Sequence, residues 1–368
     1  MKVERDIAGI TVPFAAGLAV SIYAGSSPAA HMFSSLVIIS LIVFLTHPQR
    51  RVTGTGPVWS SLIVLMLFCG YVTGSYDIMM AISDTDEMSA TEVIASDFCT
   101  SMRKAIDSIP FSNAETGEII KALITGERRG IPEDITEAFR ESGASHVLAL
   151  SGLHLGIIYG IVRAGLSFMG NSTSIKNIRS IMIILICGFY TLATGAGASI
   201  SRAFLFIAIG EYAAIRKIRF PLSVTMMASM TIQLCISPAS LKDVGFQLSY
   251  AAIAGIAFIF PTLRNFWPGD RKKDTLLDKC TRWIWDSAAM SIACQITTGP
   301  IAYYYFRSFP MHFILTNLMA IPLVTLIIPA ALVTLACSYI GWDPPILIRC
   351  TEWLTASLSW ALETISDM

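Results

Sequence analysis

The sequence predicts an all-α fold: a polytopic transmembrane helical bundle with interrupted or re-entrant helices and amphipathic interfacial helices. Three observations predict it. Hydrophobic residues make up 54% of the 368 positions, and only 14% are charged, against about 25% in soluble domains. The charges are clustered, which leaves long uncharged runs between them. The basic residues also recur in alternate loops, as they do in multi-pass membrane proteins.

The uncharged runs predict the membrane segments, because a spanning helix needs about 20 apolar residues. Eight runs meet this requirement: 7–49, 52–76, 142–162, 180–201, 220–241, 244–263, 287–306 and 308–342. The runs 7–49 and 308–342 are long enough for two segments each. The sequence therefore predicts about ten membrane segments.

The distribution of Lys and Arg predicts the orientation. With the N-terminus in the cytoplasm, 17 of the 26 basic residues fall on the cytoplasmic side, among them Arg50, Arg51 and the loop 264–282. The chain then divides into four regions: an N-terminal membrane hairpin and third span (1–76), an acidic external segment (77–141), a membrane core (142–345) and a C-terminal amphipathic helix (346–368).

The external segment 77–141 holds 14 acidic and 6 basic residues, a net charge of −8. Within it, Pro132 at a first helical position and Gly143 beyond the end predict a short helix with Ile135, Ala138 and Phe139 on one face. We expect this helix to lie along the membrane or on the protein. Residues 88–109 and 346–366 predict two more amphipathic helices, the second either interfacial or a last span.

The run 142–162 is the most informative, because it is long enough to cross a bilayer yet contains Ser145, His146, Ser151 and His154. On one helix, Ser151 and His154 share a face, and Gly152 permits close packing or a break. Three interpretations stay open: a polar constriction of a pathway, a hydrogen-bonded structural kink, and a Ser–His nucleophile pair that would need an orienting acid such as Asp243.

Arg202 is the only basic residue within an otherwise apolar stretch, directly after a Gly- and Ser-rich run that predicts a re-entrant turn opening a helix. An arginine at membrane depth is costly unless it is paired or hydrated. It could contact phosphate beside a helix N-terminus, or form a salt bridge with Asp243 or Glu211.

Other polar residues interrupt the later runs. Asp243 and Gln247 are four apart and precede Ser249, which predicts either a helix cap with a buried hydrogen bond or the lining of a hydrated cavity. Gln295 before Gly299–Pro300 and Asn317 before Pro322 predict two further helix breaks. The aromatic run 303–306 could stack bases, but it is also typical of an aromatic belt at the membrane interface.

Metal and cofactor sites are not expected. His146 and His154 are eight residues apart, a poor spacing for chelation on one helix, and the eight cysteines form no CxxC pair. The sequence predicts no metal ligands, no cofactor, no catalytic residues and no enzyme activity.

Four segments resemble the membrane domain of ComEC-type competence proteins, the DNA-uptake channel family. They are ALITGERRGIPEDITEAFRESGASHVLALSGLHLG (122–156), TGAGASISRAFLF (194–206), DVGFQLSYAAIAGI (243–256) and FPMHFILTNLMAIPLVTLIIP (309–329). Family members often carry an external OB-like domain and a C-terminal metallo-β-lactamase-like domain. The segment 77–141 looks too short and too helical for an OB barrel. Only 22 residues follow Ile346, without a His-x-His-x-Asp cluster, so we expect a membrane-only or truncated member without nuclease activity.

The resemblance implies a bacterial inner-membrane channel component that passes single-stranded DNA into the cytoplasm during natural transformation. Implied partners are the DNA in transit, a separate DNA-capture protein outside, DNA-processing proteins inside and membrane lipids; an oligomer is compatible with the sequence. The residues expected to line the pathway are Ser151, Gly152, His154, Arg202, Asp243, Gln247, Ser249, Gln295 and Asn317. Two other functions stay open: a small-solute or lipid transporter on the same scaffold, and an intramembrane hydrolase that uses Ser151 and His154.

Overall fold

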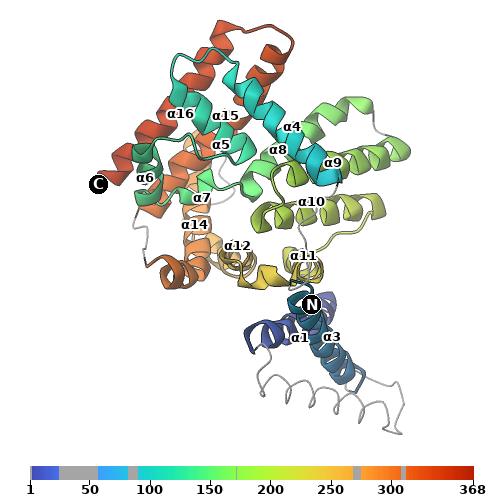
Figure 1. Cartoon of the computed structure of the whole chain (residues 1–368). Coiled ribbons are helices and arrows are strands. Elements are labelled where there is room, and N and C mark those ends of the chain that lie inside the picture. Colours follow the sequence, from blue (N-terminus) through green and yellow to red (C-terminus); the bar gives the residue numbers. More distant parts are fainter. Residues whose placement is uncertain (1, 25–56, 82–89, 171, 268–274, 308–311) are drawn as a thin grey trace. The chain divides into compact units, whose positions relative to one another are not determined.

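The structure is a computed structural model that describes residues 2–24, 57–81, 90–170, 172–267, 275–307 and 312–368. Within these ranges every regular element is helical (Figure 1), which confirms the all-α prediction. Parts of the predicted run 7–49, the acidic segment and the basic loop 264–282 lie outside the described residues, as do Arg50 and Arg51.

Six of the described helical stretches are long and apolar enough to cross a membrane. They are Asp6–Tyr23, Gly152–Met169, Thr173–Ala193, Ala198–Arg216, Val244–Asn265 and Phe313–Tyr339. Two shorter apolar stretches are Ile63–Ser75 and Leu222–Ile236. The chain is therefore a multi-pass membrane protein. The six stretches are compatible with the predicted count of about ten membrane segments, which stays a prediction.

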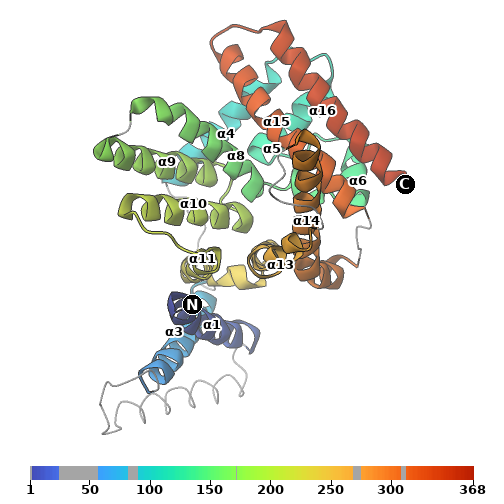
Figure 2. The same cartoon turned by 180° about the vertical axis from the view of Figure 1, so that it is seen from behind.

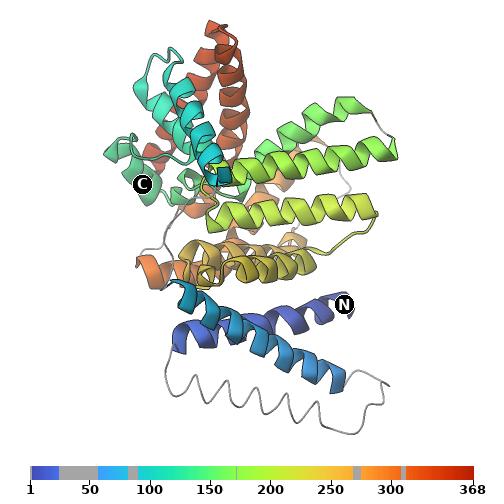
Figure 3. The same cartoon turned by 45° about the vertical axis from the view of Figure 1, so that its right-hand side comes forward.

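The helices form two compact units, one comprising residues 1–87 and 219–250 and the other residues 88–218 and 251–368. The elements of the first unit are α1 (Lys2–Ala24), α3 (Pro57–Ala81), α11 (Leu222–Ile236), η2 (Pro238–Lys242) and the start of α12 (Val244–Ala254). Helices α1 and α3 lie side by side (Figure 3). Their backbones approach closely because Gly17 and Gly70 have no side chains: a Cβ on Gly17 would lie 1.9 Å from the carbonyl oxygen of Leu67.

Hydroxyl groups cross-link the first unit. Thr11 of α1 and Thr231 of α11 are 2.8 Å apart through their hydroxyl oxygens. Tyr250 of α12 donates to the Ser229 hydroxyl, with Gln233 also at 3.2 Å. Such bonds between helices are the usual partners of polar side chains in an apolar environment.

The second unit contains the remaining helices (Figure 2). They are α4 (Ala90–Asp107), α5 (Ala114–Thr125), α6 (Glu133–Glu141), α7 (Ser145–Leu148), α8 (Gly152–Leu166), η1 (Ser167–Met169), α9 (Thr173–Ala193), α10 (Ala198–Arg216), the π-helix η3 (Gly255–Ile259), α13 (Phe260–Asn265), α14 (Leu276–Phe306), α15 (Phe313–Tyr339) and α16 (Pro345–Ser366).

Two hydrophobic clusters hold the second unit around α8. In the first, Phe139 of α6 and Val147 of α7 pack with Val324 of α15 and Leu358 of α16. In the second, residues of α8, α9 and α10 pack around Leu155, which is fully buried. Helix α8 therefore packs against both clusters, which enclose any polar side chain on its buried faces, while Gly156 and Gly160 on its remaining face are exposed.

The three amphipathic helices predicted from the sequence, two of them in the external segment, are present. Helix α6 begins after Pro132, and Ile135, Ala138 and Phe139 are buried, so this helix lies on the protein. Helix α4 covers most of the predicted range 88–109, and α16 matches the predicted range 346–366. Helix α5 was not predicted, although Asn113 caps it and Gly126 ends it in a left-handed conformation, both recognisable signals.

The two breaks predicted at the prolines of the last spans are wrong. Helix α14 continues through Pro300, and α15 continues through both Pro322 and Pro329. A proline removes one hydrogen bond, but at membrane depth the rest of the backbone must still be bonded internally, which favours a continuous helix. Near Pro300, the Thr297 and Thr298 hydroxyls both donate to the Cys294 carbonyl.

Candidate functional site

The polar run 142–162 is not one continuous helix. Helix α7 ends at Leu148 and α8 begins at Gly152, with Ser151 in an extended conformation as its N-cap. The prediction that Ser151 and His154 share a helix face is therefore wrong for Ser151, which lies outside the helix. Serine is a favoured N-cap because its hydroxyl can accept a first-turn N–H, and this local preference explains the break.

Ser151 and His154 form a reciprocal cap. The Leu153 N–H donates to Ser151 Oγ (3.3 Å), and the Ser151 N–H donates to His154 Nδ1 (3.2 Å). Ser151 Oγ also lies 3.1 Å from the same Nδ1. A general base needs a free lone pair, but Nδ1 has only one, and the backbone N–H already engages it. The geometry thus explains Ser151 as a helix cap and does not favour a nucleophile.

The same bond fixes the proton on His154. A backbone N–H can only donate, so Nδ1 is the acceptor and the neutral ring carries its proton on Nε2. His154 is fully buried, and among the described residues Nε2 has no hydrogen-bond partner. A buried donor without an acceptor costs about 1–3 kcal/mol, so this atom calls for a water or ligand oxygen.

Arg202 lies at the N-terminal end of α10, as the Gly- and Ser-rich run predicts. Gly195 and Ala196 adopt positive φ and turn the chain from α9 into α10, which begins at Ala198. The Arg202 guanidinium donates back to the Ser199 hydroxyl (3.2 Å) and carbonyl (3.4 Å), and the residue is 8% exposed. The side chain is therefore held at the start of its own helix.

The Arg202 guanidinium also reaches the start of α8. A Cβ added to Gly152 would lie 3.4 Å from Nη2 of Arg202. Helix N-termini carry partial positive charge, so the beginnings of α8 and α10 and one cation combine at this place. Such an arrangement favours an anionic oxygen. Glu211, which the sequence offered as a partner of Arg202, instead accepts from Ser180 (2.6 Å) and pairs with Arg163 (3.3 Å).

A second polar cluster joins α7, α14 and α15. His146 donates through Nδ1 to the Gly143 carbonyl oxygen (3.0 Å) and lies beside the Asn317 amide. Asn317 Nδ2 donates to Ser291 (3.2 Å), while its buried Oδ1 has no partner among the described residues. His146 is also close enough to His154 for an electrostatic interaction. Asn317 and His154 thus belong to one unit and each leave a buried polar atom unsatisfied.

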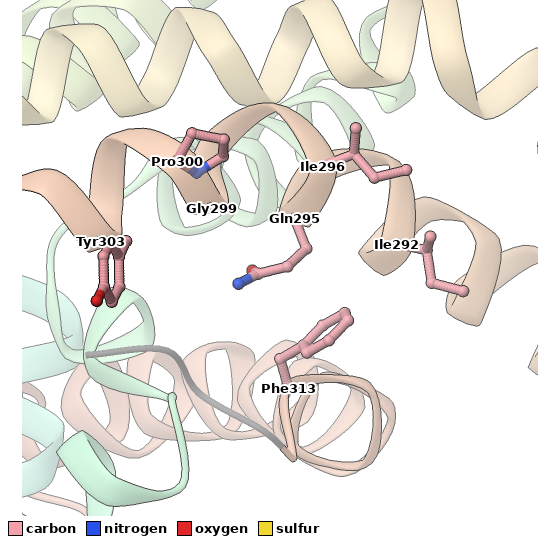
Figure 4. A pocket seen from close by; sticks show the side chains of 7 residues that line it. All are labelled: Ile292, Gln295, Ile296, Gly299, Pro300, Tyr303 and Phe313. Atoms are coloured by element: carbon pink, nitrogen blue, oxygen red, sulfur yellow. The ribbon is translucent and has the colours of Figure 1, made fainter. Parts of the chain in front are cut away.

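Gln295 lies one helical turn beyond Ser291 and lines a groove of about 500 Å³ between α14 and α15 (Figure 4). The other lining residues are Ile292, Ile296, Gly299, Pro300, Tyr303 and Phe313. Ser291 and Phe313 were not predicted, although each is four residues from a predicted residue, the spacing of one helix face.

The predicted pathway residues of the first unit lie on α12 or directly before it. Asp243 Oδ1 accepts from the N–H groups of Gly245 (2.6 Å) and Phe246 (3.3 Å), so Asp243 caps α12 as one interpretation predicted. Gln247 donates to the Leu241 carbonyl (3.0 Å), and Ser249 is half-buried on α12. The structure therefore brings Ser151, Gly152, His154 and Arg202 together, places Asn317 and Gln295 on the α14–α15 pair, and keeps Asp243 in the other unit.

Within the described ranges, no three His, Cys, Asp or Glu residues are grouped closely enough to hold a metal ion.

The π-helix η3 and α14 pack closely through their backbones. A Cβ on Gly255 of η3 would lie 2.4 Å from the Ala293 carbonyl oxygen of α14. π-Helical turns are rare and often occur at functional sites.

The sequence is similar to those of several known proteins. The chain is 27% identical over 241 residues to "ComE operon protein 3" of Bacillus subtilis (63% of this chain, 28% of the relative). It is 24% identical over 249 residues to "Uncharacterized protein YcaI" of Escherichia coli (66% and 32%), and 25% identical over 210 residues to "Competence protein ComA" of Neisseria gonorrhoeae (55% and 28%). The chain thus spans less than a third of the length of these relatives. No solved structure matches it.

The family model described as "Competence protein" matches residues 123–368, which include all of α6 to α16 and the cluster around His154, Arg202 and Asn317. The match covers well over half of the sequence and agrees with the motif resemblance in the segments 122–156, 194–206, 243–256 and 309–329. The chain therefore belongs to the competence protein family.

Proposed function

We propose that this chain is an inner-membrane channel component that passes single-stranded DNA into the cytoplasm during natural transformation. Two of its relatives carry names that refer to competence or to the ComE operon, and the family model does so as well. The N-terminus would lie in the cytoplasm, because this orientation places most basic residues inside.

The observation that carries the proposal is the position of Arg202. A phosphodiester strand brings one negative charge per nucleotide, which hydrocarbon cannot accommodate. The buried Arg202 guanidinium and the first turns of α8 and α10 offer positive charge and N–H donors within helices long enough to span the membrane. Weak contacts at several such places would let a strand enter and leave.

The glycine face of α8 gives that strand a route along the helix. Gly152, Gly156 and Gly160 are spaced by four residues, and a Cβ on Gly156 or Gly160 would meet nothing within 4 Å. The unsatisfied His154 Nε2 and Asn317 Oδ1 support a hydrated interior, since buried polar atoms without protein partners are normally satisfied by water.

Capture of DNA requires a separate protein in this proposal. The external segment 77–141 has a net charge of −8, and in the helix α6 the side chains of Glu133, Glu137 and Glu141 are exposed. Like charges would repel DNA there. Reversing Glu137 and Glu141 to Lys should strengthen DNA binding by the purified full chain; unchanged binding at low salt would argue against repulsion by this surface.

The test is deletion of the gene followed by complementation at equal membrane levels of protein. We expect deletion to abolish transformation, and Arg202→Ala and His154→Ala each to restore at most about a tenth of the wild-type frequency. Arg216→Ala is the matched control, because Arg216 is an exposed cation at the other end of α10. Unchanged transformation in the deletion strain would refute the proposal.

A further inference from the structure

The groove between α14 and α15 combines aromatic rings with one amide. Gln295 points its side-chain amide into the opening, between the rings of Tyr303 and Phe313 (Figure 4). Aliphatic side chains, a glycine and a proline make up the rest of its lining. Its volume of about 500 Å³ is within the range of about 300–1,000 Å³ that is common for small-molecule sites.

The side-chain amide of Gln295 disfavours binding of a lipid acyl chain in this groove. Among the described residues Gln295 has no side-chain hydrogen bond, so an acyl chain in the groove would leave its donors and its acceptor unpaired. Polar groups buried in hydrocarbon without a partner are strongly disfavoured. The occupant that suits the groove is a flat ring with polar edges, which can stack on an aromatic face and bond to the amide.

A cation stands at one end of the groove. The guanidinium carbon of Arg307 lies 6.0 Å from the centre of the Tyr303 ring, in a cation–π arrangement. Arg307 ends α14 as its C-cap in a left-handed conformation, and its side chain is exposed. A positive charge stacked on the same ring that lines the groove suits a ligand that carries an anion beside its aromatic ring.

We propose that this groove binds one nucleobase of single-stranded DNA, with the adjacent phosphate on Arg307; the proposal rests on the DNA-uptake function above. The base would stack on Tyr303 or Phe313, as bases do in sequence-independent single-strand sites. The Gln295 amide has two donor hydrogens and an acceptor oxygen, so it can bond to the edge of any base. The site therefore accepts every sequence, which a passing strand requires.

The helices that form the groove also carry part of the buried polar cluster. Ser291 lies one turn before Gln295 on α14, and Asn317 lies one turn after Phe313 on α15. The 3.2 Å bond between Asn317 and Ser291 shows that these two faces meet. A base held at Gln295 would thus lie one turn along α14 from Ser291, the partner of Asn317, whose Oδ1 is unsatisfied among the described residues.

The experiment uses the full chain in phosphatidylcholine nanodiscs and two fluorescent probes, a short oligothymidylate and an abasic oligonucleotide of the same length. We expect Gln295→Leu and Tyr303→Leu each to weaken oligothymidylate binding at least about fivefold, the lower limit for loss of one stacked base, and to leave the abasic probe unchanged. Tyr304→Leu and Thr298→Val are the matched controls, because both residues are on α14 but outside the groove lining.

A cross-linking measurement on the unaltered protein covers the case in which a variant does not fold. An oligonucleotide with 5-iododeoxyuridine should, on irradiation, attach to the peptide that contains Tyr303 or Phe313. Equal affinity for both probes, equal effects of Tyr303→Leu and Tyr304→Leu, or attachment only to other peptides would overturn the base site. If any of these results came together with normal transformation by Gln295→Leu, the base site would be refuted and the DNA-uptake function would not. Normal transformation in the deletion strain would refute the DNA-uptake function itself.

Discussion

Nη2 of Arg202 lies 3.4 Å from the point where a side chain on Gly152 would begin. Position 152 therefore lies at van der Waals distance from a buried cation of α10, at the first turn of α8. This contact joins two segments that the sequence presented separately, the polar run 142–162 and the Gly- and Ser-rich turn 194–206. It places a cation beside the first turns of two helices inside a unit otherwise packed by apolar side chains.

Gly152→Val should remove this contact. The β-branched side chain would occupy the space in front of the Arg202 guanidinium, and we expect transformation to fall at least about tenfold because the cation is displaced. Gly165→Val is the matched control, since Gly165 lies on α8 away from the glycine face and a Cβ there meets nothing within 4 Å. Both changes carry a similar helix-propensity effect. Equal transformation by the two variants would contradict a role for the contact.

His154→Ala should destabilise the protein by about 1–3 kcal/mol, because it leaves the Ser151 N–H without its acceptor and removes a buried ring. His154→Gln should recover part of this loss, since Gln at the third helical position can accept the same N–H in a capping box. Thermal unfolding of the purified protein in detergent measures both. A Gln variant no more stable than the Ala variant would show that the cap is not what stabilises this turn.

Gly17→Ala should weaken the packing of α1 on α3. The new Cβ would lie 1.9 Å from the Leu67 carbonyl oxygen, so the helices must move apart at a cost of about 1–3 kcal/mol or more. Gly210→Ala on α10 meets nothing within 4 Å, and there the better helix propensity of Ala should stabilise slightly, by up to about 1 kcal/mol. The opposite order of melting temperatures would contradict the close approach of α1 and α3.

Ser180→Ala should cost more stability than Arg163→Ala, although both residues bind Glu211. The Ser180 hydroxyl donates to the buried carboxylate at 2.6 Å, and a hydrogen bond to a charged group contributes about 1.5–3 kcal/mol. The Arg163 side chain is 55% exposed, so water screens its ion pair and the expected loss is below about 1 kcal/mol. Chemical unfolding of the two variants checks the order, and a larger loss for Arg163→Ala would overturn it.

Periodicity and composition predicted the helical class, the amphipathic helices α4, α6 and α16, and the turn before Arg202, because those features depend on local residue patterns. They did not settle helix continuity. In the run 142–162 a break at Gly152 stayed open as one interpretation, and the cap preference of Ser151 explains the break that is present there. Breaks were expected at Pro300 and Pro322, but the need to bond the backbone internally at membrane depth carries the helices through both.

The candidate residues were found one by one, but their grouping was not. Each of Gly152, His154, Arg202 and Asn317 is recognisable as a polar or small residue in an apolar run. That Arg202 meets Gly152, and that Glu211 is paired with Arg163, depends on how α8, α9 and α10 pack, which a single sequence does not encode in its local patterns. Asp243 carried the same kind of signal and proved to cap α12 in the other unit.

The central claim is that a DNA strand passes along the glycine face of α8, beside Arg202. Benzoylphenylalanine at position 156 tests it most directly in competent cells taking up labelled DNA, since the space beside Gly156 is open. Benzoylphenylalanine at position 185 is the control, because Leu185 is exposed on the apolar surface of α9. We predict a covalent DNA adduct on irradiation at position 156 and none at position 185. Uptake at the normal level with no adduct at position 156 would contradict the claim.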